Sequence, residues 1–519
     1  MKHALAACCL AVCLVGAGPA AAAPGLPSKN VAWVPAAADA DVDRAFVRAR
    51  AENKPVLLYW GATWCPPCNQ LKATLFNRQD FAVQARNFVA VHVDGDRPGA
   101  QKLGKRFGVS AYPTLVLFAP DGHEITRLPG EAEPEQVLAL LQQALAGGRP
   151  VKALVADALA GRTLAANEWR ALAFYAWDVD DGRVVALSER AALLARLAAA
   201  APAADDETTT RLWLKALVAD EGKGAVKADA ALRERVRRVA ADPALARRHA
   251  DVFVWSAADL VRALADGQAP ERSPLVPLFD AALQKLAADA SLSRADRQGA
   301  LGSRVELARL AVPEDAVKVE LAPALLQLVR EQAARDEREI SDGYERQAVI
   351  TGDAHLLARA GLWAESDALL KANLTKSHSP YYLMSQLGGN ARKLGRTDDA
   401  LGWYRQAFEK SEGPATRLQW GGGYVAALIE LAPQDGARIE KTAAQLLDEA
   451  GRDAGAFQGR SVRSLQRLGA KLAAWNQGGR HAAALKRLQA RLDGVCRKVD
   501  AADGARETCR TLLQPRAAG

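Results

Sequence analysis

The chain contains little sulfur. Seven cysteines and two methionines are present among 519 residues, and three of the cysteines fall within the first 23 positions. A small domain held together by disulfides has a much higher cysteine density, and a chain of this length can bury several apolar cores without such help. The sequence therefore excludes a disulfide-built scaffold. Four cysteines remain to be explained, namely Cys65, Cys68, Cys496 and Cys509.

Long hydrophobic runs are missing after the N-terminus. Residues 1–23 carry a lysine, then an uncharged apolar stretch, then a run of alanines, which is the order of a secretory signal peptide. The stretch is short of the roughly 20 residues that a transmembrane helix needs, so we expect cleavage and no membrane span in the mature chain. High alanine and arginine content with little lysine is typical of a bacterial gene. We therefore expect export to the periplasm, an oxidising compartment.

Dense blocks of basic residues are also absent. The net charge of +8 is distributed along the chain, and no segment has the composition of a basic arm that binds nucleic acid. We therefore expect no nucleic-acid partner.

Residues 24–148 alternate between amphipathic segments and short valine- and leucine-rich runs typical of buried strands. An Asp-Gly turn within 114–128 joins the last two predicted strands into a hairpin. This order predicts an α/β fold in which helices flank a sheet. The predicted helices are 41–54, 68–76, 100–108 and 133–145, and the other predicted strands are 55–61 and 88–94.

The remainder of the chain has no comparable strand pattern. Alanine, leucine and arginine recur at helical spacing, and short polar breaks separate the helices. This pattern predicts an all-α region of paired antiparallel helices. We divide it into an all-helical domain at 149–340, helical repeats at 341–480 and a C-terminal helical segment at 481–519.

The segment WGATWCPPC (60–68) places two cysteines where a predicted buried strand passes into a helix. Cys65 falls at or near the helix N-cap, and the two prolines after it occupy the first turn, where a missing N–H costs nothing. A thiolate there faces unpaired N–H groups and the positive end of the helix dipole, which lower its pKa. Cys68 lies one turn further on, close enough to bond to Cys65. Redox chemistry is the favoured interpretation; a zinc site, which needs about four ligands, and a purely structural disulfide are the alternatives.

Residues 35–146 resemble the thioredoxin superfamily through WGATWCPPC and FGVSAYPTLVLF (107–118). The resemblance implies that Cys65 is the attacking cysteine and Cys68 the resolving one. It implies that Pro113 is the cis-proline that shapes the substrate groove, that Tyr112 pairs its backbone with a bound substrate, and that Trp64 covers the cysteine pair.

One position departs from the family pattern. Many thioredoxins carry a buried acid six residues before the first cysteine, where this chain has Tyr59. Deprotonation of Cys68 must then use water or another group.

The segments RAGLWAESDALLKA (359–372) and KLGRTDDALGWYRQAF (393–408) carry glycines 34 residues apart, Gly361 and Gly395. A helix–turn–helix period of this length resembles the tetratricopeptide repeat, and stacked repeats present a concave face. A partner-binding groove is the functional interpretation, and a spacer or dimerisation arm is the alternative. The glycine-rich segment WGGGY (420–424) is not followed by Lys-Ser or Lys-Thr, so we expect close helix packing there and no phosphate-binding loop.

Cys496 and Cys509 stand 13 positions apart near the C-terminus. A structural disulfide that staples the last helix is the favoured interpretation in an oxidising compartment, and a second redox relay is the alternative.

These features predict a periplasmic thiol–disulfide oxidoreductase of the protein-disulfide reductase or isomerase class. Its substrates would be protein thiols and disulfides, a redox partner protein would recycle it, and no metal or other cofactor is expected. The alternative is a periplasmic scaffold of the tetratricopeptide type, for binding or assembly, in which the thioredoxin fold is an interaction module. A scaffold would not need both thiols of the intact C-P-P-C pair, which favours the enzyme.

Overall fold

A five-stranded sheet forms the N-terminal part of the chain. The computed structural model describes residues 27–265, 269–501 and 504–514, so the predicted signal segment 1–23 lies outside the described residues. The strand order is β1-β3-β2-β4-β5, with β1, β3 and β2 parallel and with β4 antiparallel to both β2 and β5. The strands are β1 (Val34–Ala36), β2 (Val56–Gly61), β3 (Val89–Asp94), β4 (Thr114–Phe118) and β5 (Glu124–Leu128).

Helices cover both faces of this sheet, as the sequence predicted. They are α1 (Asp39–Glu52), α2 (Pro66–Leu71), α3 (Gln79–Gln84), α4 (Ala100–Phe107) and α5 (Pro134–Leu145). A π-helical turn at Lys72–Phe76 continues α2. The sequence analysis missed β1 and α3, because a three-residue strand and a six-residue helix are too short to show a period.

Alternate side chains of β2 point to opposite faces of the sheet, as strand geometry requires. Leu58 and Trp60 belong to the apolar core that includes α1 and α4. Leu57 and Tyr59 belong to a second core on the face of α2 and α5. This second core continues without a break into the helices that follow, as far as Leu307.

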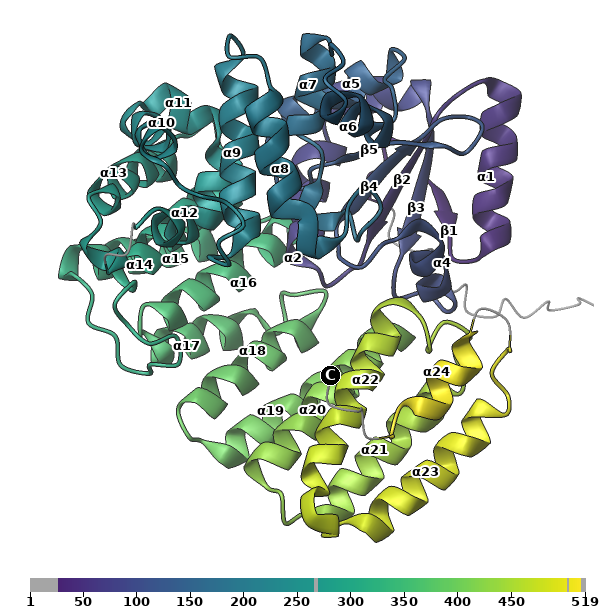
Figure 1. Cartoon of the computed structure of the whole chain (residues 1–519). Helices are drawn as coiled ribbons and strands as arrows, with labels where there is room; N and C mark the ends of the chain where they lie inside the picture. The colour runs from purple at the N-terminus through teal and green to yellow at the C-terminus, as the bar shows by residue number, and fades with distance from the viewer. Residues whose placement is uncertain (1–26, 266–268, 502–503, 515–519) are drawn as a thin grey trace, which may run out of the picture.

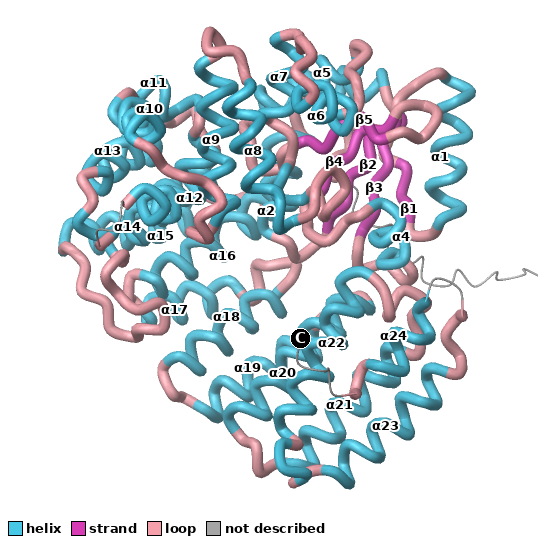
Figure 2. Tube along the Cα trace, viewed as in Figure 1, coloured by secondary structure: helices cyan, strands magenta, loops and turns pink. Residues whose placement is uncertain are grey.

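All remaining helices and turns form an all-α region, as predicted. Beyond β5 the described residues contain no strand, and Figure 2 shows the strands gathered in one part of the molecule. The nineteen described helices are α6 (Val151–Leu159), α7 (Ala166–Ala173), α8 (Arg190–Ala200), α9 (Asp206–Asp220), α10 (Ala230–Ala241), α11 (Pro243–Arg248), α12 (Ala250–Leu264), α13 (Leu275–Ala288), α14 (Arg294–Ala308), α15 (Pro323–Glu339), α16 (Gly343–Arg359), α17 (Trp363–Asn373), α18 (Pro380–Lys393), α19 (Thr397–Lys410), α20 (Pro414–Leu431), α21 (Gly436–Ala450), α22 (Gly459–Trp475), α23 (Ala482–Cys496) and α24 (Ala505–Thr511).

The helical region curves away from the sheet and then returns to it (Figure 1). Helix α16 packs on α2, and α22 packs on α4, so helices from the middle and the end of the chain both contact the N-terminal domain. Close helix packing explains Gly421 of WGGGY within α20, because a Cβ there would come within 2.4 Å of Leu446, whereas a Cβ on Gly423 would meet nothing within 4 Å. None of the described helices combines the length and the apolar character needed to cross a membrane.

Candidate active site

The cysteine pair lies in the turn between β2 and α2. Cys65 is the N-cap residue of α2, and its sulfur accepts a hydrogen bond from the backbone N–H of Cys68 at 3.2 Å. The two cysteines form a disulfide, and their Cα atoms lie 5.3 Å apart. Cys65 is only 2% exposed and Cys68 is fully buried. Cys65 therefore has the N-cap position that the sequence predicted, and its sulfur is shielded in this arrangement.

The loop before β4 lies against the cysteine pair. Its Tyr112–Pro113 peptide bond is cis, and Tyr112 packs against the cluster that Cys65 and Cys68 form with Ala62. The hydroxyl of Tyr112 accepts a hydrogen bond from the side-chain amide of Gln101 at 2.7 Å. The pairing of β4 with β2 thus brings two residues that are distant in sequence to the cysteine turn.

Trp64 is bound by helices from the far end of the chain. Its ring stacks on Tyr382 of α18, with centroids 5.9 Å apart and planes 17° apart, and contacts Trp420 of α20 edge-on at 5.1 Å. Its Nε1–H points to Asp96 Oδ2 and Thr416 Oγ1, both at 2.8 Å. The side chain expected to serve the substrate groove therefore also anchors the helical region.

A buried ion pair lies at this anchor. Asp96 follows β3, and Arg460 of α22 pairs with its carboxylate. The hydroxyl of Thr416 also donates to Asp96, at 2.5 Å. The Arg460 guanidinium lies 5.0 Å from the ring centroid of Trp64 and 5.3 Å from that of Tyr112. One cation of the helical region thus contacts both loops that flank the cysteines. We call Trp64, Asp96, Thr416 and Arg460 the docking cluster.

Backbone groups of the cysteine turn are bound in the same way. The side-chain amide of Gln347 in α16 donates to the carbonyl of Trp64 at 3.1 Å. His378 Nε2 lies 3.1 Å from the carbonyl of Thr63, where it can only donate. The helical region therefore holds the turn in place through two of its backbone carbonyls.

Buried titratable groups lie behind the cysteines. Burial raises the pKa of Tyr59, which keeps its phenol protonated, and its hydroxyl has no partner among the described residues. Asp94, at the end of β3, pairs in register with Gly61 just before the cysteine turn. Burial raises the pKa of the Asp94 carboxyl, and the charge of Asp96 raises it further, whereas the charge of Lys72 lowers it. Asp94 is therefore a candidate for the group that accepts the proton of Cys68, a role that the protonated phenol of Tyr59 does not fill.

A cavity of about 990 Å³ lies between α2 and the helical region. From the N-terminal domain its wall includes Pro66, Pro67, Gln70, Tyr112 and Pro113. From α12, α14, α16 and α18 its wall includes Trp255, Gly302, His355, Arg359 and Tyr382. The two predicted groove residues of the cis-peptide thus share one cavity with the residue that follows Cys65.

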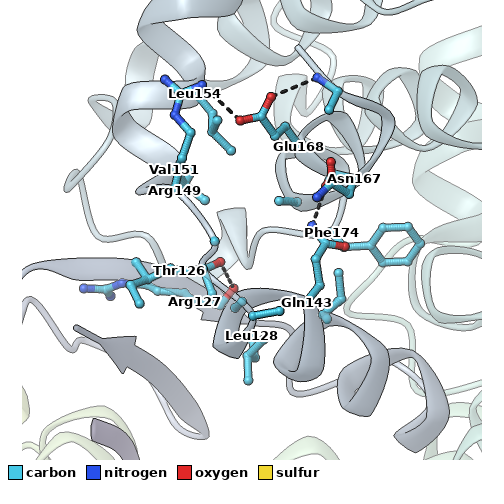
Figure 3. A pocket seen from close by; sticks show the side chains of 18 residues that line it. Thr126, Arg127, Leu128, Gln143, Arg149, Val151, Leu154, Asn167, Glu168 and Phe174 are labelled. Carbon is cyan, nitrogen blue, oxygen red and sulfur yellow. Dashed lines mark hydrogen bonds and ion pairs between the residues drawn. The ribbon is translucent and has the colours of Figure 1, made fainter. Parts of the chain in front are cut away.

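A smaller cavity of about 370 Å³ lies between β5, α5 and α7 (Figure 3). Arg149 pairs with Glu168 at 3.0 Å, and Gln143 donates to the carbonyl of Asn167 at 2.5 Å. Its wall includes no residue of the cysteine turn and neither residue of the cis-peptide. This cavity therefore lies apart from the cysteine pair.

The second cysteine pair lies far along the chain from the first. A disulfide joins Cys496, the last residue of α23, to Cys509 in α24. Both cysteines are buried in the apolar core of the C-terminal helices. The bond therefore ties the last described helix to its neighbour.

Comparison with known proteins places the N-terminal domain in a class. Residues 42–145 match the family described as thioredoxin-like domain. With the sheet and its C-P-P-C turn, this defines a thioredoxin-like domain followed by a long all-helical region.

Individual relatives match a fraction of the chain. It is 30% identical over 116 residues to thiol:disulfide interchange protein DsbD 2 of Pseudomonas aeruginosa, covering 22% of this chain and 20% of that protein. It is 36% identical over 86 residues to thioredoxin H4 of Arabidopsis thaliana, covering 16% of this chain and 66% of that protein. A solved thioredoxin from Thermus thermophilus is 26% identical, covers 22% of this chain and 86% of its own, and has a TM-score of 0.20. The chain thus spans about a fifth of the interchange protein that it matches.

The residues that sequence reasoning missed belong mostly to the docking cluster. Asp96, Thr416 and Arg460 come from three distant segments, and no spacing in the sequence relates them. The available signal was a pair of aspartates at the end of the valine-rich strand at 88–94. Asp94 is its last residue, and Asp96 follows two positions later.

Proposed function

We propose that this protein is a thiol–disulfide oxidoreductase that exchanges disulfides with protein substrates. The observation that supports this best is the Cys65–Cys68 pair at the N-terminus of α2 in a thioredoxin-like domain. Unpaired N–H groups at that end of the helix stabilise a thiolate on Cys65. A thioredoxin-like domain also implies protein thiols as partners.

In the reducing direction the Cys65 thiolate attacks one sulfur of a substrate disulfide. A Cys65–substrate bond forms while the substrate disulfide breaks, and the first substrate thiolate leaves and takes up a proton. Deprotonated Cys68 then attacks Cys65, the intramolecular disulfide forms, and the second substrate thiolate leaves. Two electrons pass from the cysteine pair to the substrate, and a dithiol partner protein restores the pair. Oxidation of a substrate is the same sequence in reverse.

We propose that the protein functions in the periplasm. The support is the signal-like order of residues 1–23 and the second disulfide, Cys496–Cys509, which suits an oxidising compartment. N-terminal sequencing of the protein from a periplasmic fraction should find a start near Pro24. An intact Met1 in the membrane pellet would count against export.

The tetratricopeptide-like character of the helical region is likewise our proposal. Gly361 and Gly395 both adopt positive φ, of 81° and 70°, just after helices α16 and α18. Each residue follows the last turn of a helix and permits the chain to reverse into the next one. The 34-residue period therefore coincides with two equivalent helix–turn–helix units, which supports a partner-binding role.

The burial of Cys65 favours a second candidate, a scaffold in which the thioredoxin fold only binds the helical region. The test is the reduction of a short synthetic peptide disulfide by the mature protein, with dithiothreitol as electron donor. The oxidoreductase predicts that Cys65→Ser abolishes turnover and that Cys68→Ser accumulates a mixed disulfide detectable by mass spectrometry. Cys496→Ser/Cys509→Ser is the matched control and should retain turnover. Equal turnover by wild type and Cys65→Ser would refute the oxidoreductase and leave the scaffold as the function that the structure supports.

A further inference from the structure

The wall of the 990 Å³ cavity comes from both parts of the chain, and its location decides how a substrate can reach Cys65. Pro66, the residue after Cys65, lines the cavity, as do both residues of the cis-peptide. Elsewhere Gln347 binds the backbone of the cysteine turn and the docking cluster holds Trp64, while Cys65 itself is only 2% exposed. A reacting sulfur therefore approaches from the cavity.

The cavity limits the size of what can enter. About 990 Å³ is at the upper end of the roughly 300–1,000 Å³ range of small-ligand pockets. A short extended peptide segment or a small molecule fits this volume, and a folded domain does not. The helical wall would collide with a folded protein that presents a disulfide on its own surface.

The charge of the wall selects among short segments. Only two permanent cations line the cavity, Lys215 and Arg359, and each is already bound to a carboxylate, at 2.9 Å and 2.6 Å respectively. Five carboxylates line it, namely Glu131, Asp178, Asp251, Glu306 and Glu314. Asp251 is paired with the buried Arg211 behind the wall, so the five carboxylates exceed Lys215, Arg359 and Arg211 by two charges. The excess of negative charge attracts cations and repels anions.

An aromatic side chain is also exposed in the wall. Trp255 of α12 is 51% exposed, which is unusual for so large an apolar group. Its face can bind a lysine or arginine side chain through a cation–π contact. The wall of α14 is recessed at Gly302, where an added Cβ would meet only one atom, at 4.0 Å. This leaves room beside Trp255 for a peptide backbone.

We propose that the helical region completes a substrate chamber for short, extended, cationic cysteine-containing segments of unfolded polypeptide. The proposal rests on the proposed oxidoreductase function and specifies its substrate class. The sulfur chemistry is the exchange written above, with the peptide disulfide as the group that is reduced. Trp255 and Glu314 determine specificity, and Cys65 and Cys68 perform the exchange.

The test compares three substrates of the full-length protein with dithiothreitol as donor: a lysine-flanked peptide disulfide, the same peptide flanked by glutamate, and folded insulin. We expect kcat/KM for the lysine-flanked peptide to exceed that for the glutamate-flanked one at least tenfold at low salt, and insulin to be reduced more slowly than either. High salt should reduce the difference between the peptides.

Gly302→Leu is the blocking variant. The position lies within α14, where leucine is a better helix former than glycine, and the new side chain would project into the chamber. We expect a fall of at least tenfold in kcat/KM for the lysine-flanked peptide with an unchanged equilibrium potential of the Cys65–Cys68 pair. Gly402→Leu in α19, where an added Cβ meets nothing within 4 Å, is the matched control outside the cavity. It should behave as wild type.

Two further variants test specificity without filling the chamber. Trp255→Ala and Glu314→Lys should each weaken the preference for the lysine-flanked peptide severalfold. Their controls are Leu187→Ala and Glu409→Lys, exposed positions that do not line the cavity.

The outcomes separate this inference from the proposed function. If wild type and Cys65→Ser reduce every tested disulfide to the same extent, the oxidoreductase function itself is refuted. If wild type is active but both peptides and insulin react alike, or Gly302→Leu matches Gly402→Leu, the chamber is refuted and the oxidoreductase stands.

Discussion

Removing the cation of the docking cluster should uncover Cys65. In Arg460→Met the Asp96 carboxylate keeps the hydrogen bonds from Trp64 and Thr416 but loses its ion-pair partner, and the side chains of the pair are only 10% and 11% exposed. Breaking one partner of a buried pair costs about 3 kcal/mol or more. That loss raises the undocked population on the order of 100-fold, and in the undocked chain a reagent reaches Cys65 without passing through the chamber.

The assay is the alkylation rate of Cys65 by iodoacetamide in the reduced protein, followed by mass spectrometry. Arg487→Met is the matched control, because its ion pair with Glu440 is exposed and contacts neither cysteine turn nor cavity. An exposed pair contributes about 0–1 kcal/mol, so the control should alkylate like wild type. Equal rates in Arg460→Met and wild type would refute the view that docking shields Cys65.

Three further predictions concern stability and proton transfer. Cys496→Ser/Cys509→Ser should lose about 3 kcal/mol of unfolding free energy in denaturant titrations and keep peptide reduction; lost activity in a folded variant would indicate a relay. Burial and the neighbouring Asp296 raise the pKa of Glu133, the N-cap residue of α5, from 4.5 to about 8. The stability that its proton contributes is therefore complete below pH 4.5 and is lost as pH rises through 8. Urea midpoints of Glu133→Gln should therefore fall less between pH 6 and 9 than those of wild type, and parallel curves would contradict this. Asp94→Asn should slow decay of the mixed disulfide, measured by rapid quench, and unchanged decay would exclude Asp94 as the proton acceptor.

Local chemistry made the N-terminal domain predictable from its sequence. The strand at 55–61, the prolines after Cys65 and the hairpin at 114–128 each carry a signal within a few residues, and the fold class followed from their order. The cis-peptide at Pro113 came from resemblance, since a single proline carries no such information.

The enclosure of the site could not be predicted in the same way. Trp64 and Thr416 are 352 residues apart, and Asp96 and Arg460 are 364 apart. Helical periodicity shows which face of α20 or α22 is apolar, but it does not state which surface that face will cover. The sequence therefore predicted a helical region with a partner-binding groove but not where that region packs, and in the structure its helices return to the N-terminal domain.

That return has a consequence for how the newly made chain acquires its final state. Contacts between residues more than 350 positions apart form only once Thr416 and Arg460 have been synthesised, whereas the sheet needs only the first 128 residues. A thioredoxin-like domain that folds as it emerges presents Cys65 to its surroundings until α18, α20 and α22 arrive. During that interval the cysteine pair is open to any thiol or oxidant of the compartment. The order of synthesis thus sets whether the Cys65–Cys68 pair is oxidised or reduced when the helices close over it. This happens before the chamber selects any substrate.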